Sequence, residues 1–329
     1  MSRSARPEPI EERSFHHWLS RHLAAGRGGM LPIGDDVAAI PLAGRRVALL
    51  TTDALSEGTH FLRDSDPGLI GEATAAVSLS DIAAKGGVPI AGLLDLLLPP
   101  GTRASWAQAV ARGADRMGRR FGAPIVGGDT KPATGRSVVG TFVGFGRSDR
   151  LAPRSGARPG DWVVVTGTVG GGGAAARMLH ERGRRREALA ALLHVRPRVA
   201  EGQRLIAWAH AMTDTSDGLA AAARLVSVAS RRRVDIDIDS IPWDRRLVAA
   251  TPRADARVES GFYGGDYELF ATISPRSFPA ARRAARALGC RLTVIGRVRT
   301  GRGAWLVSRG AAARPMPPEG WNPFGRTRT

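Results

Sequence analysis

The sequence is poor in cysteine, lysine and long apolar runs, and each shortage excludes a class of protein. Cys290 is the only cysteine, so the chain can form neither an internal disulfide nor a cysteine-rich zinc site. The longest apolar stretch, Ile90 to Pro100, contains Asp95 and is shorter than the roughly 20 residues that span a bilayer. The N-terminus lacks the apolar core of a signal peptide. We therefore expect a soluble, cytoplasmic enzyme with no membrane segment.

Lysine is nearly absent from a strongly basic chain. The formal net charge is +18, yet Lys85 and Lys131 are the only lysines among 48 basic residues, so arginine supplies the charge. Arginine runs at 184–186 and 231–233 lack the interleaved aromatic residues that stack on bases. We interpret the pattern as compositional bias and keep a nucleic-acid-binding protein as the alternative from another class. A basic field would also attract anionic substrates.

The length of the chain, 329 residues, exceeds the size at which a single core stops growing, so we expect two domains. Proline and glycine punctuate the polar stretch from Asp149 to Gly160, and we place the boundary there, giving domains 1–149 and 150–329. The first domain alternates strands and helices. Apolar periodicity predicts helices over 8–25, 72–85, 103–121, 174–182, 199–211 and 219–230, and strands over 47–52, 123–126, 137–146, 162–165, 234–238, 268–273 and 291–298.

Aspartates recur where glycine-rich turns or apolar elements end. They occur in Gly34-Asp35-Asp36, Thr51-Thr52-Asp53, Ser80-Asp81, Gly127-Gly128-Asp129-Thr130 and Asp214-Thr215-Ser216-Asp217-Gly218. A single Asp beside Gly is common in turns, where its side chain accepts hydrogen bonds from nearby backbone N–H groups. Many carboxylates brought together, however, would repel one another unless cations held them. Because Mg²⁺ is commonly shared between a few carboxylates and substrate phosphates, we hypothesise a multi-metal, phosphate-handling site.

Asp81 is the strongest of these candidates. It lies four residues after Val77 on the apolar face of the predicted helix 72–85, where a carboxylate needs a cation or several donors. Asp53 and Asp129 end short apolar runs that we interpret as strands. Open sheets tend to bind ligands beyond the carboxyl ends of their strands, so we expect these acids to lie at such an edge.

Other segments have structural explanations. Asp235, Asp237 and Asp239 alternate with apolar residues, so we place them on the outer face of a half-buried strand rather than at a metal. The run from Gly167 to Gly173 is either a flexible strand-to-helix turn or a backbone cradle for an anion, since the ending of a Walker A loop is absent. The strand 137–146 is too apolar to remain an open edge, and we expect a second chain or a helix to cover it.

Six motifs form an ordered set along the chain. They are Gly34-Asp35-Asp36, Thr51-Thr52-Asp53 followed by Glu57-Gly58-Thr59-His60-Phe61, Ser78 to Ala84, Gly127-Gly128-Asp129-Thr130, Arg154 to Asp161, and Asp214 to Leu219. Their order and rough spacing resemble those of the thiamine-monophosphate kinases, which belong with aminoimidazole ribonucleotide synthetase, selenophosphate synthetase and the hydrogenase maturation dehydratase. The resemblance extends from about Gly34 to Phe324.

The resemblance implies an ATP-dependent kinase that converts thiamine monophosphate to thiamine diphosphate. It also implies an α/β N-terminal domain, whose sheet pairs with that of a second subunit to form a barrel in a homodimer, and an α+β C-terminal domain. The positions that match the family's Mg²⁺ site are Asp36, Thr51, Thr52, Asp53, Asp81, Asp129, Asp214 and Asp217. Positions that match nucleotide contacts are Gly128, Asp129, Arg154 and Ser216, and those that match substrate contacts are His60, Gly265 and Trp321.

The implied reaction suits these residues. Phosphoryl transfer through a loose transition state requires alignment and charge neutralisation more than a covalent nucleophile. Several Mg²⁺ ions on the aspartates would bridge the phosphates of ATP and the acceptor, and Arg154 would offer forked donors that stabilise charge. The acceptor phosphate is itself a nucleophile at neutral pH. We therefore assign no catalytic acid or base.

One motif departs from the family pattern. Where the family usually carries Gly-Glu-Asp-Tyr-Glu, this chain has Gly264-Gly265-Asp266-Tyr267-Glu268, so the carboxylate that faces the substrate is missing at Gly265. The motifs implied to bind ATP and metal are unaffected by that change. A paralogue that uses the same ATP site on another phosphate or carboxylate acceptor is therefore the alternative to a thiamine-monophosphate kinase.

Overall fold

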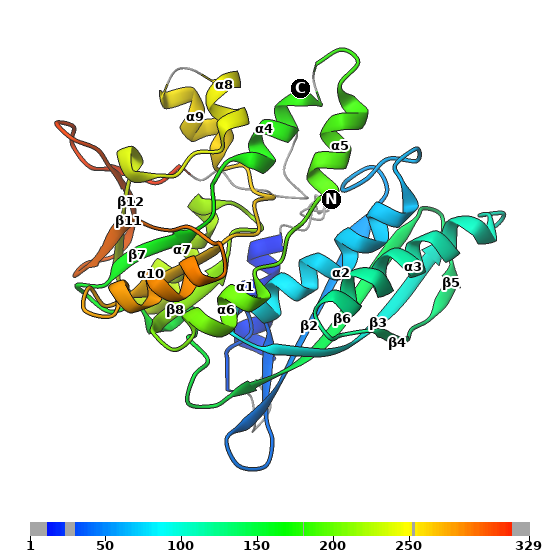
Figure 1. The fold of residues 1–329 in the computed structure, drawn as a ribbon, viewed down its shortest axis with the longest axis horizontal. Helices are drawn as coiled ribbons and strands as arrows, with labels where there is room; N and C mark the ends of the chain where they lie inside the picture. The colour runs from blue at the N-terminus through cyan, green and yellow to red at the C-terminus, as the bar shows by residue number, and fades with distance from the viewer. Residues whose placement is uncertain (1–11, 24–29, 180, 252–253, 318–329) are drawn as a thin grey trace, which may run out of the picture.

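The computed structural model describes residues 12–23, 30–179, 181–251 and 254–317 (Figure 1). Strands and helices form two halves that lie side by side, each built on its own sheet (Figure 1). Among these residues, no helix is both long and apolar enough to cross a membrane.

The first half contains a six-stranded sheet in the order β1-β2-β6-β3-β4, with β5 paired to β3. Its elements are α1 (Glu12–His22), β1 (Ala38–Pro41), β2 (Arg46–Ser56), α2 (Pro67–Ala84), β3 (Val88–Leu98), α3 (Ala104–Arg120), β4 (Ile125–Gly127), β5 (Thr130–Pro132) and β6 (Ser137–Arg147). β2, β6 and β3 are antiparallel neighbours, whereas β4 and β5 run parallel to β3. α2 and α3 pack together over one face of this sheet (Figure 1).

The centre of the first sheet corrects two expectations. The apolar run that starts at Ile90, considered above only as a candidate membrane segment, lies in β3. Residues 137–146 form β6 as predicted, but β6 is not an edge strand, because it pairs with β2 on one side and β3 on the other. The expectation that a second chain or a helix must cover its edge is therefore wrong. Strands of the same chain already bond its backbone groups.

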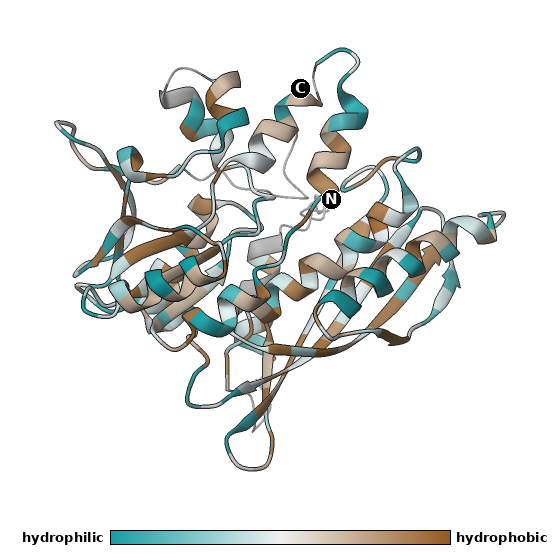
Figure 2. Cartoon of the chain, viewed as in Figure 1, coloured by the Kyte–Doolittle hydropathy of each residue, from teal (hydrophilic) through white to brown (hydrophobic). Residues whose placement is uncertain are grey.

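Helix α2 carries apolar residues all around its axis because other elements, among them α3, β6 and α6, pack against several of its faces. It begins before the predicted start at residue 72, since the Asp66 carboxylate accepts from two N–H groups of the first turn and Pro67 occupies the first position. α3 approaches it closely, and a Cβ at Gly71 would lie 2.0 Å from the backbone oxygen of Val110, so only glycine fits there. α3 itself is amphipathic, and Figure 2 shows hydrophilic and hydrophobic residues alternating along it.

The second half contains a seven-stranded sheet in the order β13-β12-β9-β11-β7-β10-β8. Its elements are the 3₁₀ turns η1 (Arg154–Gly156) and η2 (Ile238–Ser240), the helices α4 (Gly171–Met178), α5 (Arg185–Leu193), α6 (Val199–Leu205), α7 (Leu219–Ser230), α8 (Arg245–Ala250), α9 (Ala254–Gly261) and α10 (Phe278–Ala287), and the strands β7 (Trp162–Thr166), β8 (Ala209–Asp214), β9 (Arg233–Asp237), β10 (Leu269–Ile273), β11 (Leu292–Arg299), β12 (Gly303–Val307) and β13 (Arg314–Pro315). α7 covers one face of the sheet, and α6 and α10 lie on the face that turns toward α2.

One hydrophobic core joins the two halves. It contains Leu79 and Ile82 of α2 together with Leu205 of α6, Met212 of β8 and Phe278 of α10. A separate core lies on the other face of the second sheet, beneath α7. The junction is therefore packed with apolar side chains, and it places α2 directly against β8.

The predicted helix 199–211 is wrong in its second part. α6 ends at Leu205, and the chain turns before residues 209–214 enter the second sheet as β8, paired with β10. The alanines of this segment favour a helix locally, but the backbone pairing with β10 overrides that weak preference. This correction matters for the site, because Asp214 is the last residue of β8 rather than part of a loop that follows a helix.

The predicted environment of Asp235 is also wrong. The side chain lies on the face of β9 opposite Val234, as the alternation requires, yet it is buried. Arg233 and Arg299 cover it, with Nε atoms 2.6 and 2.7 Å from its two carboxylate oxygens. An outward-facing acid here is shielded from water because long arginine side chains close over it.

Candidate functional site

Four of the predicted aspartates meet at the junction of the two halves. Asp36 comes from the loop before β1, Asp53 from β2, Asp81 from α2 and Asp214 from the end of β8. One ligand oxygen from each of Asp36, Asp81 and Asp214 lies within 4.8 Å of the other two. Asp53 interacts electrostatically with both Asp81 and Asp214. Segments far apart in the sequence therefore supply one cluster of carboxylates.

Asp53, Asp81 and Asp214 accept side-chain hydrogen bonds from hydroxyl groups, and we call them the hydroxyl-held acids. Asp36 also accepts one, from Thr213, but it is paired with cations as well. The pairs are Thr51 to Asp81 (2.5 Å), Ser78 to Asp53 (2.8 Å), Ser80 to Asp214 (2.6 Å) and Ser216 to Asp214 (2.8 Å). The donors come from β2, from α2 and from the loop after β8. Neutral donors fix the orientation of a carboxylate, but they supply no net positive charge.

Cations hold the fourth acid, Asp36, and its chain neighbour Asp35, which we call the cation-held acids. The Lys85 ammonium lies 2.7 Å from Asp35 and 2.6 Å from Asp36, and all three side chains are buried. Arg154 donates through Nη2 to Asp36 at 2.5 Å and through Nη1 to the backbone oxygen of Gly34 at 2.6 Å. Burial opposes ionisation of Asp36, but Arg154 and Lys85 outweigh it and hold its pKa below the ordinary value.

The hydroxyl-held acids show the opposite shift. Burial, opposed by the Ser78 hydrogen bond, raises the pKa of Asp53 to about 6. Burial and the neighbouring charge of Asp36 raise the pKa of Asp214 to about 6. The pKa of Asp81 is raised well above its ordinary value by burial and by the charges around it. This side of the cluster therefore has an excess of negative charge.

The hydroxyl-held acids and Asp36 fit a hard divalent cation. They present convergent carboxylate oxygens, which are the donors that Mg²⁺ prefers, and they carry more negative charge than the protein neutralises. A metal bound there would displace the protons that the raised pKa values retain on the acids. Asp36, Asp81 and Asp214 could hold such an ion, with Asp53 beside them.

Asp129 and Thr52 lie outside this cluster. Asp129 follows β4, is exposed, and accepts from the N–H of Thr130 while pairing with Lys131 at 3.2 Å. Those two contacts lower the pKa of its carboxyl group. Thr52 points to the opposite side of β2 from its neighbours and shares a 2.9 Å hydrogen bond with Thr141 on β6. The structure thus brings together the acids of α2, β2 and β8 but not that of the β4 end.

The other predicted residues lie at several places around the cluster. Asp217 is two positions before α7, next in the loop to Ser216. His60 follows β2, where its Nδ1 accepts from the N–H of Ser56 at 3.1 Å and where burial lowers its pKa. A Cβ at Gly128 would lie 1.8 Å from a backbone oxygen of β3, so this position requires glycine. Trp321 lies outside the described residues.

The glycine-rich run from Gly167 to Gly173, which leads into α4, binds the side-chain carboxylate of Asp266. The N–H groups of Gly170 and Gly172 donate to the two carboxylate oxygens of Asp266 at 2.8 and 3.1 Å. Of the two open alternatives, a turn or an anion cradle, the run is a turn whose backbone holds an internal carboxylate. Burial raises the pKa of Asp266 to about 7. Gly265, just before it, has φ +80, a conformation that side chains other than glycine rarely adopt.

Several residues of the site were not singled out from the sequence. Lys85 is buried beside the cation-held acids, and Thr213 donates to Asp36 at 2.7 Å. Tyr267 lies near the hydroxyl-held acids, since burial and the charges of Asp214 and Asp53 raise its pKa. A usable signal existed for Lys85. It is one of two lysines in an arginine-rich chain, and it follows Asp81 by four residues, the spacing that places two side chains on one helix face.

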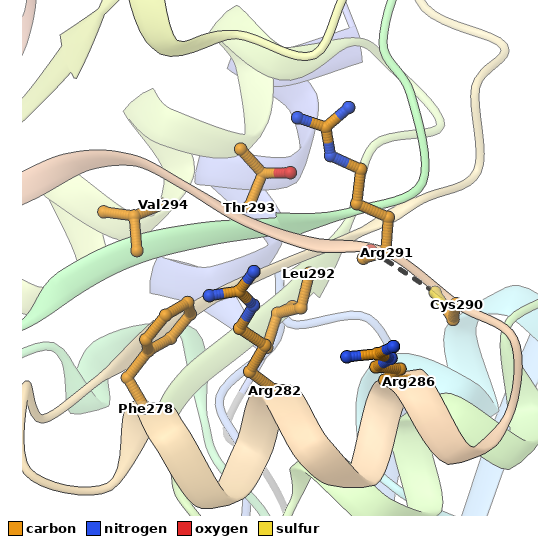
Figure 3. A pocket seen from close by; sticks show the side chains of 8 residues that line it. All are labelled: Phe278, Arg282, Arg286, Cys290, Arg291, Leu292, Thr293 and Val294. Atoms are coloured by element: carbon orange, nitrogen blue, oxygen red, sulfur yellow. Dashed lines mark hydrogen bonds between the residues drawn. The ribbon is translucent and has the colours of Figure 1, made fainter.

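A cavity of about 420 Å³ lies elsewhere, between α10 and β11. Figure 3 shows arginine side chains of α10 and the start of β11 around it. None of its lining residues belongs to the acid cluster. We therefore locate the candidate site by the convergence of its charged groups and not by the size of a cavity.

Comparisons with known proteins place the chain in a family. Residues 34–146 match the family model of the AIR synthase related protein, N-terminal domain, and residues 158–306 match that of its C-terminal domain. The chain is 30% identical to the thiamine-monophosphate kinase of Caulobacter vibrioides, over 95% of this chain and 91% of that one. It is 33% identical to the thiamine-monophosphate kinase of Escherichia coli K12, over 82% of this chain and 84% of that one.

Solved structures are also similar. A structure of AaThiL complexed with AMPPCP and TMP superposes with a TM-score of 0.81 at 27% identity, over 98% of this chain and 99% of that one. The thiamine-monophosphate kinase of Stenotrophomonas maltophilia K279a gives a TM-score of 0.74 at 32% identity, over 88% and 93% of the two chains. The hydrogenase maturation protein HypE in complex with ATP, at 17% identity and a TM-score of 0.67, shares the fold.

Proposed function

Because this chain belongs to the thiamine-monophosphate kinase family of AIR synthase related proteins, we propose that it transfers the terminal phosphate of ATP to thiamine monophosphate. The observation that carries the proposal is the convergence of Asp36, Asp81 and Asp214 where the two halves meet. A similar structure carries AMPPCP and TMP, which supports the same pair of ligands here.

We assign metal binding to Asp36 and the hydroxyl-held acids. When bound, Mg²⁺ neutralises charge on the phosphates and lowers the barrier to transfer. The hydroxyl donors of β2 and α2 hold the carboxylates in place before any ligand arrives, so little reorganisation is needed. We keep Thr51, Thr52, Asp129 and Asp217 as proposed members of the site, with Asp129 at an exposed position where it would reach a nucleotide.

Arg154 has a more specific role in this proposal than the sequence indicated. Each of its three side-chain nitrogens already donates to a protein oxygen, at Asp36, Gly34 and Thr213. We propose that it first positions Asp36 and then offers its remaining N–H groups to a phosphate. Ser216 and Gly128 are proposed nucleotide contacts.

No residue is needed to remove a proton from the acceptor, because a phosphate monoester is already anionic at neutral pH. Alignment and charge neutralisation are the tasks left to the protein. His60, Gly265 and Trp321 remain the proposed contacts of the acceptor. A cytoplasmic location and a division into domains 1–149 and 150–329 remain predictions.

A homodimer is part of the proposal, because the described residues leave one face of the first sheet exposed. α2 and α3 cover the other face, which leaves apolar side chains of β3 exposed at Val88 (53%), Ile90 (36%) and Leu93 (42%). Val126, in β4, is 65% exposed. Apolar patches of this kind commonly mark a contact surface, and the face of a second copy would cover them. Sedimentation velocity at micromolar concentration tests this, and a monomer would contradict it.

An ATP-consumption assay with a panel of phosphorylated acceptors tests the proposed activity. We expect turnover with thiamine monophosphate and Mg²⁺, and a loss of about 100-fold or more in Asp214→Asn. Asp64→Asn, at an exposed acid that is not a member of the cluster, is the matched control. Turnover with a different acceptor would favour the paralogue. Salt-dependent binding to DNA without ATP turnover would favour the nucleic-acid alternative.

A further inference from the structure

We propose that Lys85 is a resident counter-cation of the proposed metal site, which supplies inside the fold one of the positive charges that the acid cluster requires. The inference rests on the proposed function, because it concerns the same acids. It assigns Lys85 a charge-balancing role, with no contact to substrate.

Three protein oxygens lie within 2.7 Å of the Lys85 ammonium. Its Nζ lies 2.7 Å from Asp35 Oδ1, 2.6 Å from Asp36 Oδ2 and 2.6 Å from the backbone oxygen of Met212. An ammonium group has three N–H donors, and here three close oxygens surround it. The side chain is 0% exposed, so water does not compete for these donors. The three oxygens come from the loop before β1 and from β8, so Lys85 also joins the two halves.

The charges around Lys85 show why a cation is needed at this point. Asp35 and Asp36 are adjacent buried acids, and Asp36 also lies within 4.8 Å of Asp81 and Asp214. Without Lys85, Arg154 would be the one cation paired with the cation-held acids within the part of the chain that the structure describes. The lysine therefore balances the negative charge of Asp35 and Asp36 through direct ion pairs, and it lowers the number of positive charges that must be bound from solution.

The choice of lysine supports the same conclusion. The chain carries 48 basic residues, and Lys85 and Lys131 are the only lysines. Arginine fills nearly every other basic position, including Arg154 on the opposite side of Asp36. A compact ammonium fits three converging oxygens in a closed space, whereas the planar guanidinium fork suits one carboxylate edge. Position 85 therefore uses the side chain that its geometry demands.

The test compares Lys85→Met, Asp35→Asn and the double variant by metal-free melting temperature and by Mn²⁺ affinity from electron paramagnetic resonance. Lys85→Met should melt at a lower temperature without metal, because the cation-held acids lose a counter-ion. It should bind Mn²⁺ more tightly, by about tenfold or more, because a nearby positive charge is gone. Asp35→Asn should weaken Mn²⁺ binding about tenfold, because the lysine charge is then less neutralised. Arg120→Met, which removes an exposed charge, is the control.

The double variant separates charge from packing. Adding Asp35→Asn to Lys85→Met should restore at least half of the lost metal-free melting temperature, since the unpaired acid is removed. No recovery, or weaker Mn²⁺ binding in Lys85→Met, would show that Lys85 only fills space and would overturn the proposal. If Lys85→Met does not fold, unchanged Mn²⁺ affinity in Asp35→Asn overturns it alone.

These readouts do not depend on turnover, so failure of the proposed activity is distinguishable from failure of this inference. Expected shifts in Mn²⁺ affinity without kinase activity on any acceptor would refute only the activity. Wild-type protein that binds no Mn²⁺ would refute the metal site and the role of Lys85 together.

Discussion

The two sides of the acid cluster are equally buried but differ in what holds them. The cation-held acids face Lys85 and Arg154, and the pKa of Asp36 is lowered. The hydroxyl-held acids face neutral donors, and their pKa values are raised. The comparison shows that hydrogen bonds orient a carboxylate without removing the cost of its charge. The first side is complete within the fold, whereas the second depends on cations from solution.

Removing one of the cation-held acids should have the largest effect on this difference between the two sides. Asp36→Asn leaves Lys85 and Arg154 with less buried negative charge, and we expect it to lower the free energy of unfolding by about 3–5 kcal/mol. Urea denaturation of metal-free protein at neutral pH measures this, with Asp64→Asn as the control. A loss no larger than that of the control would show that the two cations contribute little to stability.

The pH dependence of stability separates the two sides. Asp53 and Asp214 have folded pKa values of about 6 against an ordinary value of 3.8, so the folded protein keeps protons that the unfolded chain releases between these values. Their stabilising contribution is complete below about pH 4 and is lost as the pH rises through about 6.

We expect metal-free protein to lose roughly 1–3 kcal/mol across that window. Saturating Mg²⁺ should abolish the loss, because the metal then replaces the protons. A separate fall between about pH 4 and 7, from Asp266 with its pKa of about 7, should persist with Mg²⁺ because this carboxyl lies outside the acid cluster. An identical pH profile with and without the metal would contradict the metal-binding role of the hydroxyl-held acids.

Removing one of the hydroxyl-held acids should change the stability of the metal-free protein in the opposite direction. Asp81→Asn relieves repulsion within the cluster, so we expect metal-free protein to gain roughly 1–2 kcal/mol and to lose its stabilisation by Mg²⁺. Melting curves with and without Mg²⁺ measure both effects. Destabilisation of metal-free Asp81→Asn would mean that the Thr51 hydrogen bond outweighs the repulsion.

Adding an acid at Gly265, close to the hydroxyl-held acids, should have the smallest effect of these variants. Gly265 donates to the backbone oxygen of Ser216, whose hydroxyl binds Asp214. A Cβ at Gly265 has room, with its nearest neighbour at 3.5 Å, but φ +80 should cost about 1–2 kcal/mol in any variant. Gly265→Ala therefore serves as the control for Gly265→Glu. We expect the glutamate variant alone to lower the KM for thiamine monophosphate, and equal KM values would show that this position does not select the acceptor.

Local patterns predicted the acids that a single element positions. Asp81 follows from helix periodicity, and the helix 219–230 matches α7 in full. Asp53 was expected just after the end of its strand. β2 instead continues to Ser56, and Asp53 faces the cluster because alternate residues of a strand point to the same side. Sheet order was beyond such patterns, so β3 was not identified as a strand and β6 was taken for an edge. Both follow from pairings between distant residues.

The contacts between the acids of the cluster were harder to predict from the sequence than the acids themselves. Ser80 and Asp214 are 134 residues apart and meet only because the two halves pack through a shared core. Lys85 was overlooked because a lysine at a helix end is usually solvated, and its burial depends on β8. Asp129 carries an equally suggestive motif but stays outside the cluster, since its carboxylate contacts Thr130 and Lys131 and its backbone bonds to Asp95 and Leu96 of β3.

Strand β2 has a consequence for how the chain can change length. Thr51 and Asp53 turn inward to the cluster, whereas Thr52 between them turns outward toward the face that we propose a second copy covers. Inserting one residue before Thr51 would exchange the two faces, sending Asp53 outward and placing Thr52 where Asp53 now faces the site. Inserting two would restore the orientation. We therefore expect insertions and deletions in related sequences to occur in the turns that flank β2. Within the strand, only changes of two residues keep Thr51 and Asp53 on the side of the cluster.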